Sequence, residues 1–164
     1  MANPQTTTKP ITIGNLELYT VETGRFKLDG GAMFGVVPKT LWNRKIDCDE
    51  KNRISMAMRC LLIKSNATGR IYLVDNGCGD KFDEKMQHIY SLSFKHSELE
   101  RSLMEVGVSP SDVTDMVFTH LHFDHCGGTT TYDESGSLVH RFENATYHVN
   151  RRHWQTPTQP NARE

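Results

Sequence analysis

The stretch DMVFTHLHFDHCGG, residues 115–128, joins a short apolar run to a cluster of three histidines and one aspartate. Residues 115–119 have the length and composition of a short buried strand. His120 and His122 follow directly, and residues i and i+2 of an extended segment point to the same side of the chain. The two imidazoles can therefore bind one metal ion as a pair.

Asp124 and His125 come where the chain turns, so their side chains can point towards a second metal position nearby. Imidazole and carboxylate are the ligands that zinc prefers when no thiolate is used. Gly127 and Gly128 allow the backbone to turn away without Cβ clashes. A lone histidine in such a place is usually an ordinary polar residue, whereas three histidines and an aspartate after an apolar strand predict a metal site.

Four further segments have the pattern of strands. Residues 11–22 alternate loosely between apolar and polar side chains, as in a strand pair broken by a turn. Residues 56–65 and 70–75 are two apolar segments joined by a short hairpin turn, and residues 145–149 suggest one more strand. The sequence is therefore rich in short strands on both sides of the histidine cluster.

Helical segments lie between these strands. Residues 80–91 place apolar side chains at helix-like spacing, and residues 97–100 (Ser-Glu-Leu-Glu) form a capping box that opens a helix ending at Gly107. Two strands, a helical stretch and another strand are typical of an α/β unit. We therefore expect an α/β fold, with a turn at residues 29–31 and an irregular apolar loop at residues 32–35.

The length of 164 residues suits one compact domain, since domains cluster at roughly 100–150 residues. We expect a flexible N-terminal arm at residues 1–10, one folded domain over residues 11–154 and a polar tail over residues 155–164. No segment approaches the ~20 apolar residues of a membrane span, and the N-terminus lacks the apolar stretch of a signal peptide. Four scattered cysteines without C-x-x-C spacing fit a reduced protein, so we expect a cytoplasmic location and no membrane partner.

The charge of the chain bears on its partners. Nineteen basic and twenty acidic residues give a formal net charge of −1. Proteins that bind nucleic acid usually carry a basic excess or a basic stripe, and neither is present here. We therefore expect no nucleic-acid partner.

Residues 119–128 resemble the H-x-H-x-D-H-x-G signature of the metallo-β-lactamase superfamily. The stretch DGGAMFG, residues 29–35, is most similar to the lactonase-like zinc hydrolases of that superfamily. The resemblance implies an α/β fold of the αββα sandwich type, made of two similar halves. Residues 15–154 would form the N-terminal half only.

The resemblance also implies roles for individual residues. His120 and His122 would bind a first zinc ion, and Asp124 and His125 a second, although other divalent metals are possible. Asp75 matches an aspartate that supports the ligands from behind. The alternative for Asp75 is a simple turn residue at the end of a strand.

Met33 and Phe34 are weaker candidates. The matching loop of similar lactonases lines the substrate pocket, so the resemblance implies that both side chains contact the substrate. Packing in the core or at an interface is the alternative, and the sequence does not separate the two.

The superfamily places a third histidine, a bridging aspartate and a last histidine downstream of the signature. The later histidines of this chain, His140, His148 and His153, come too soon after it. We interpret His148 and His153 as ordinary polar residues. The chain therefore offers two ligands for each metal position, and the source of the remaining ligands stays open.

The implied activity is metal-dependent hydrolysis, in which a zinc-bound hydroxide attacks an ester or lactone carbonyl. Asp124 would orient the hydroxide and return a proton to the leaving group. A small ester or lactone is then the expected partner, with acyl-homoserine lactones favoured.

Two alternatives remain open. The chain could be a non-catalytic metal-binding fragment whose uncovered sheet face promotes self-association or awaits a C-terminal half. It could also be a nuclease of the same superfamily, against which its near-neutral charge argues.

Overall fold

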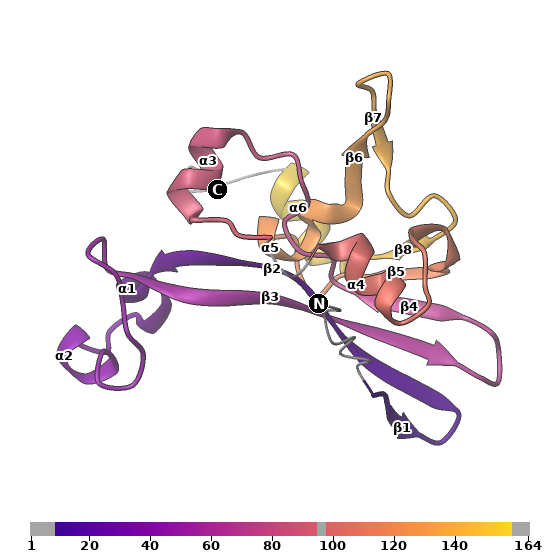
Figure 1. The fold of residues 1–164 in the computed structure, drawn as a ribbon, viewed down its shortest axis with the longest axis horizontal. Coiled ribbons are helices and arrows are strands. Elements are labelled where there is room, and N and C mark those ends of the chain that lie inside the picture. The colour runs from indigo at the N-terminus through magenta and orange to yellow at the C-terminus, as the bar shows by residue number, and fades with distance from the viewer. Residues whose placement is uncertain (1–8, 95–97, 159–164) are drawn as a thin grey trace, which may run out of the picture.

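The computed structural model describes residues 9–94 and 98–158, and its main element is a six-stranded sheet in the order β1-β2-β3-β4-β5-β8 (Figure 1). The strands are β1 (Ile11–Ile13), β2 (Leu16–Asp29), β3 (Arg53–Ser65), β4 (Ile71–Val74), β5 (Asp115–Val117), β6 (Thr130–Tyr132), β7 (Leu138–His140) and β8 (Thr146–His148). The helices are α1 (Gly30–Phe34), α2 (Lys39–Trp42), α3 (Glu84–Tyr90), α4 (Leu99–Glu105), α5 (Phe123–Cys126) and α6 (Arg151–Thr158), with 3-10 turns at Pro110–Asp112 and Gly127–Thr129.

Strands β1 to β4 pair antiparallel, whereas β4, β5 and β8 run parallel. Parallel neighbours need a crossover connection, and the segment that contains α3 and α4 connects β4 to β5. This mixed sheet with helices confirms the predicted α/β fold class.

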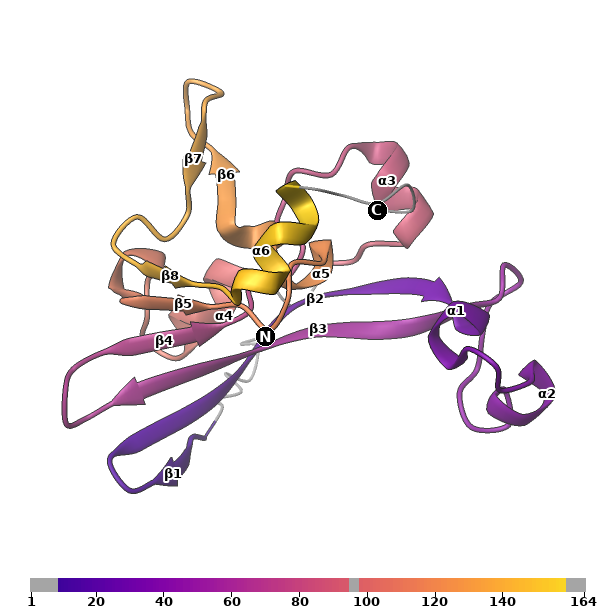
Figure 2. The same ribbon diagram turned by 180° about the vertical axis from the view of Figure 1, so that it is seen from behind.

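The paired strands β2 and β3 extend well beyond the lengths predicted from the sequence. They form a long arm that carries α1 and α2 at its far end (Figures 1 and 2). The pairing shifts register between Glu22 and Gly24, and Gly24 has a φ of 140°. Residues with a side chain rarely adopt this φ, so the bulge favours a glycine.

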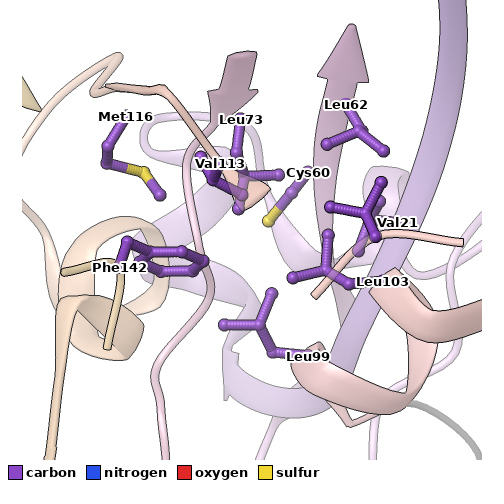
Figure 3. Packing of buried hydrophobic residues seen from close by; sticks show 10 residues of the cluster. Val21, Cys60, Leu62, Leu73, Leu99, Leu103, Val113, Met116 and Phe142 are labelled. Carbon is purple, nitrogen blue, oxygen red and sulfur yellow. The ribbon is translucent and has the colours of Figure 1, made fainter. Parts of the chain in front are cut away.

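The main core lies between the sheet and α4 (Figure 3). Leu103 of α4 packs with Leu62 and Leu73 of the sheet, and all three are fully buried. Met116 and Phe142 belong to the same cluster. Burial of these side chains holds β4 and β5 side by side, and that pairing positions the histidine stretch.

The other face of the sheet is less covered. Leu61 pairs with Val74 and alternates along β3 with the buried Leu62, yet it remains 37% exposed. Ile63 and Val74 are partly exposed as well. One half of an αββα sandwich is expected to leave such a face open.

Several local predictions were wrong in their limits or type. Residues 32–35, expected as an irregular loop, belong mostly to the one-turn helix α1, because the Asp29 carboxylate accepts a hydrogen bond from Ala32 N at 3.0 Å. The strand expected at residues 115–119 ends at Val117. The hairpin of β6 and β7 was not predicted at all.

Other predictions fall partly beyond the described residues. The capping serine, Ser97, lies outside them, as do residues 1–8 of the expected arm and 159–164 of the expected tail. Helix α6 crosses the expected domain boundary at residue 154. No helix within residues 9–94 and 98–158 is long and apolar enough to cross a membrane.

Candidate metal centre

The histidine stretch lies at the edge of the sheet where β4 and β5 end. These strands are parallel, so the residues that follow each of them emerge at the same edge. Asp75 follows β4, and its amide donates to the Val117 carbonyl at 2.9 Å. The fold thereby brings Asp75 next to residues that lie more than forty positions later in the sequence.

The Asp75 carboxylate contacts two residues of the histidine stretch, Thr119 and His125. Its Oδ1 accepts a hydrogen bond from Thr119 N at 2.9 Å, and its Oδ2 accepts one from Thr119 Oγ1 at 2.7 Å. The same Oδ2 lies 2.8 Å from Nδ1 of His125. When Nδ1 carries the proton in this contact, Nε2 of His125 keeps a free lone pair that can bind a metal.

The backbone at Asp75 supports this arrangement. Asp75 is only 6% exposed and has a φ of 60°, a left-handed conformation that aspartate tolerates better than most residues. The chain therefore turns sharply at Asp75 and leaves the sheet, and the Asp75 carboxylate contacts His125.

The four predicted ligands form two close pairs. Nε2 of His120 lies 3.0 Å from Nδ1 of His122, and Nε2 of His125 lies 3.3 Å from Oδ2 of Asp124. Two ligands of one tetrahedral zinc, each about 2.0–2.1 Å from the metal, are about 3.4 Å apart. Each pair of donor atoms is thus spaced closely enough to share one ion.

The three imidazoles are also close to one another. The ring centroids of His120 and His125 are 4.0 Å apart, and those of His120 and His122 are 4.6 Å apart. Burial, followed by the neighbouring His125 and His122, lowers the pKa of His120. The neutral form of imidazole, which is the one that binds metal, is favoured as a result.

The donor chemistry fits zinc, but the donors do not complete a site. Among residues 9–94 and 98–158, no group of three or more histidine, cysteine, aspartate or glutamate side chains is arranged to hold a metal ion. A catalytic zinc normally has three protein ligands. Within the described residues, each of the two donor pairs therefore falls short of the three protein ligands of a catalytic zinc.

Aromatic packing fixes the start of α5, which sequence reasoning did not anticipate. The ring of Phe123 lies among those of Phe26, Phe82 and Tyr90, at centroid distances of 5.8, 5.4 and 4.7 Å. This contact anchors the residue between His122 and Asp124. The apolar spacing in residues 80–91 indicated a helix but not this partner.

The turn after α5 is pressed against the loop after β4. Asn76 N donates to the His125 carbonyl at 2.8 Å, and Gly128 N donates to the Gly77 carbonyl at 3.0 Å. A Cβ added at Gly127 would lie only 2.3 Å from the carbonyl oxygen of Cys78. Gly127 is therefore needed for close backbone contact as well as for turning the chain.

The structure does not bring Met33 and Phe34 to the histidines. Both lie in α1, at the far end of the β2–β3 arm from α5 in both views (Figures 1 and 2). Phe34 stacks on Trp42 with ring centroids 5.1 Å apart, and Met33 is 44% exposed. Phe34 therefore packs against another side chain, which is the alternative to contact with the substrate.

His148 also lies apart from the predicted ligands. Its Nε2 is 2.8 Å from Oδ1 of the buried Asp115, which is also paired with Arg70. This contact ties β8 to β5 and agrees with the interpretation of His148 as an ordinary polar residue.

Comparison with solved structures supports the fold. A probable metal-dependent hydrolase from Staphylococcus aureus is 32% identical, with a TM-score of 0.82, over 93% of this chain and 53% of that chain. AidC, a dizinc quorum-quenching lactonase, is 26% identical, with a TM-score of 0.67, over 94% of this chain and 48% of that chain.

Sequence comparison agrees. A probable metallo-hydrolase of Mycobacterium tuberculosis is 28% identical over 115 residues, which is 63% of this chain and 37% of that protein. The chain thus spans well under two thirds of the length of each of these relatives. The profile of the metallo-beta-lactamase superfamily matches residues 59–161, more than half of the chain. The chain belongs to the metallo-beta-lactamase superfamily.

Proposed function

We propose that the chain carries part of the metal centre of a metal-dependent hydrolase that acts on an ester or lactone carbonyl. The two close donor pairs, His120 with His122 and Asp124 with His125, support this proposal best. Membership of a superfamily that includes a dizinc lactonase supports a metal cofactor.

We assign two ligands to each metal position. His120 and His122 would hold one ion through Nε2 and Nδ1, and Asp124 and His125 would hold a second through Oδ2 and Nε2. Asp75 would keep His125 in the tautomer that presents Nε2. Zinc suits this set of imidazole and carboxylate ligands, in one or two copies, although other divalent metals accept the same ligands.

The reaction would then depend on a few side chains of the chain itself. If these residues hold zinc, the metal would lower the pKa of bound water to about 7 and so supply a nucleophile at neutral pH. Asp124 would accept a hydrogen bond from that nucleophile, orient it and return a proton to the leaving alcohol. The remaining ligands would come from outside the described residues.

A lactone is the substrate that we favour. AidC is described as a lactonase in complex with an acylated homoserine product, and its likeness to this chain extends over 94% of the chain. The exposed position of His122 leaves the donor set accessible to a small molecule. We therefore propose a lactone as the substrate of this protein.

Zinc content and lactone hydrolysis test the proposal together. The chain is dialysed against zinc, its metal content is measured, and ring opening of an N-acyl-homoserine lactone is followed with a pH indicator. His122→Ala should lower zinc affinity at least about tenfold and reduce hydrolysis. His88→Ala, which changes an exposed histidine on α3, is the matched control. Hydrolysis that is equally fast in His122→Ala would contradict the proposal.

A second candidate is a metal-binding unit without activity of its own. The observation in its favour is that the described donors do not form a group of three. Stoichiometric zinc binding that depends on His122 but yields no lactone or ester hydrolysis would favour this candidate.

A further inference from the structure

Lys81 lies in the loop between β4 and α3 and reaches the turn that follows the proposed ligands. Its Nζ donates to the Thr130 carbonyl at 2.6 Å and also to the Gly127 carbonyl. Gly127 is the first residue of the 3-10 turn that comes directly after α5, and Thr130 is the residue that follows this turn. One ammonium group thus bridges the two ends of this turn.

The partial burial of Lys81 strengthens its two hydrogen bonds. The side chain is partly buried, and this burial lowers the pKa of its ammonium group. A lysine loses water when it is buried and recovers that loss only through strong hydrogen bonds. Bonds from an ionised donor are roughly twice as strong as bonds between neutral groups.

Other contacts hold the turn as well, from the same loop and from Arg141, whose Nε donates to the Gly128 carbonyl at 3.1 Å. Asn76 N binds the His125 carbonyl, and Asn76 Nδ2 donates to Thr129 Oγ1 at 3.0 Å. These contacts fix the beginning and middle of the segment that follows Asp124. Lys81 adds hydrogen bonds to the carbonyls of Gly127 and Thr130.

We propose that Lys81 is a positioning residue for the metal centre. Its ammonium group holds the turn after α5 against the loop after β4, and so keeps Asp124 and His125 in place beside Asp75. Lys81 touches none of the proposed ligands and acts through the backbone that carries them. The inference rests on the proposed function, because it assumes that Asp124 and His125 bind a metal.

Three variants of the full chain separate positioning from general stability. Lys81→Met keeps a long side chain but removes the ammonium group, and Lys81→Arg retains a cationic donor. Lys85→Met removes an exposed lysine on α3 and is the control. Zinc affinity is measured by competition with a chromophoric chelator, below the unfolding temperature of every variant, and the cobalt-substituted proteins are compared by their visible absorption.

Outer groups that orient metal ligands typically contribute about 10–100-fold to metal affinity. We expect Lys81→Met to bind zinc about 10–100-fold more weakly, with a changed cobalt spectrum, and Lys81→Arg to recover most of the affinity. Lys85→Met should match the parent chain. After the metal has been removed with a chelator, amide hydrogen exchange of residues 125–131 should be faster in Lys81→Met than in the parent chain.

The results also distinguish this inference from the proposed function. If the parent chain binds zinc and folded Lys81→Met binds it equally well, the positioning role is wrong and the metal centre stands. If the parent chain binds no zinc, both are wrong. If amide hydrogen exchange at residues 125–131 is the same in Lys81→Met as in the parent chain, Lys81 does not hold this turn, whatever the zinc affinities are. Should Lys81→Met fail to fold, Lys81→Gln replaces it in the same comparison.

Discussion

At the scale of single residues, the Asp75 carboxylate has the most demanding position in the candidate site. It is buried, accepts two hydrogen bonds from Thr119 and contacts Nδ1 of His125. A carboxylate can accept all of these bonds at once, because it has two oxygens and about four lone-pair sites. An asparagine of the same shape has one acceptor oxygen and a donating amide in place of the other.

We expect Asp75→Asn to weaken zinc binding about 10–100-fold, since His125 loses the partner that sets its tautomer. The metal-free protein should also lose about 1–3 kcal/mol of unfolding free energy, because buried groups are left badly paired. Chelator competition and urea denaturation measure the two effects. Asp47→Asn, at an exposed loop aspartate, should change neither. Parent-like zinc affinity in folded Asp75→Asn would contradict the supporting role of Asp75.

At the scale of elements, the site depends on two loops that touch through their backbones. The loop after β4 contributes Asn76 and Cys78, and the turn after α5 contributes Gly127 and Gly128. A Cβ at Gly128 would lie 2.3 Å from the carbonyl oxygen of Asn76, as close as one at Gly127 would lie to that of Cys78. The obstacle in both cases is backbone, which cannot move aside by rotation of a side chain.

Gly127→Ala should therefore separate the two loops. We expect a loss of about 1–3 kcal/mol of unfolding free energy from overpacking, together with weaker zinc binding. Gly14→Ala is an informative comparison, because Gly14 has a φ of 58° but nothing within 4 Å of an added Cβ. It measures the cost of left-handed backbone without a clash and should leave zinc affinity unchanged. A Gly127→Ala protein with parent-like stability would show that the loops can separate freely.

At the scale of the whole molecule, the two faces of the sheet differ in their cover. The face with Leu62 and Leu73 is buried beneath α4, whereas Leu61 on the other face is 37% exposed. Contiguous exposed apolar surface favours association. Because of this contrast, we expect the exposed face to be covered either by a second copy of the chain or by a C-terminal half.

We expect the chain alone to associate as its concentration rises, and Leu61→Lys to reduce that association. Sedimentation velocity over a concentration series measures the change. Ile89→Lys, which places the same charge at an exposed apolar residue of α3, should have a smaller effect. A parent chain that stays monomeric at every concentration would contradict the prediction.

The sequence alone predicted much of the local chemistry. Most of the sheet strands, the helices α3 and α4, the α/β class and the grouping of the histidine stretch follow from patterns within a few residues, whereas α1, α2 and the β6–β7 hairpin were not predicted. Side-chain alternation and ligand chemistry act over that short range, so local sequence is enough to predict them. Element limits were less accurate, as in the length of β2 and β3, because pairing between strands extends them beyond their individual patterns.

Only the tertiary structure decided which distant residues meet at the site. Asp75 contacts His125 across fifty positions, and Lys81 reaches Thr130 across forty-nine, because the parallel pairing of β4 and β5 brings their following loops to one edge. Met33 and Phe34, by contrast, lie in α1 at the end of the long β2–β3 arm, away from α5. Such contacts depend on the register and burial of the whole sheet, and no local pattern in the sequence records them.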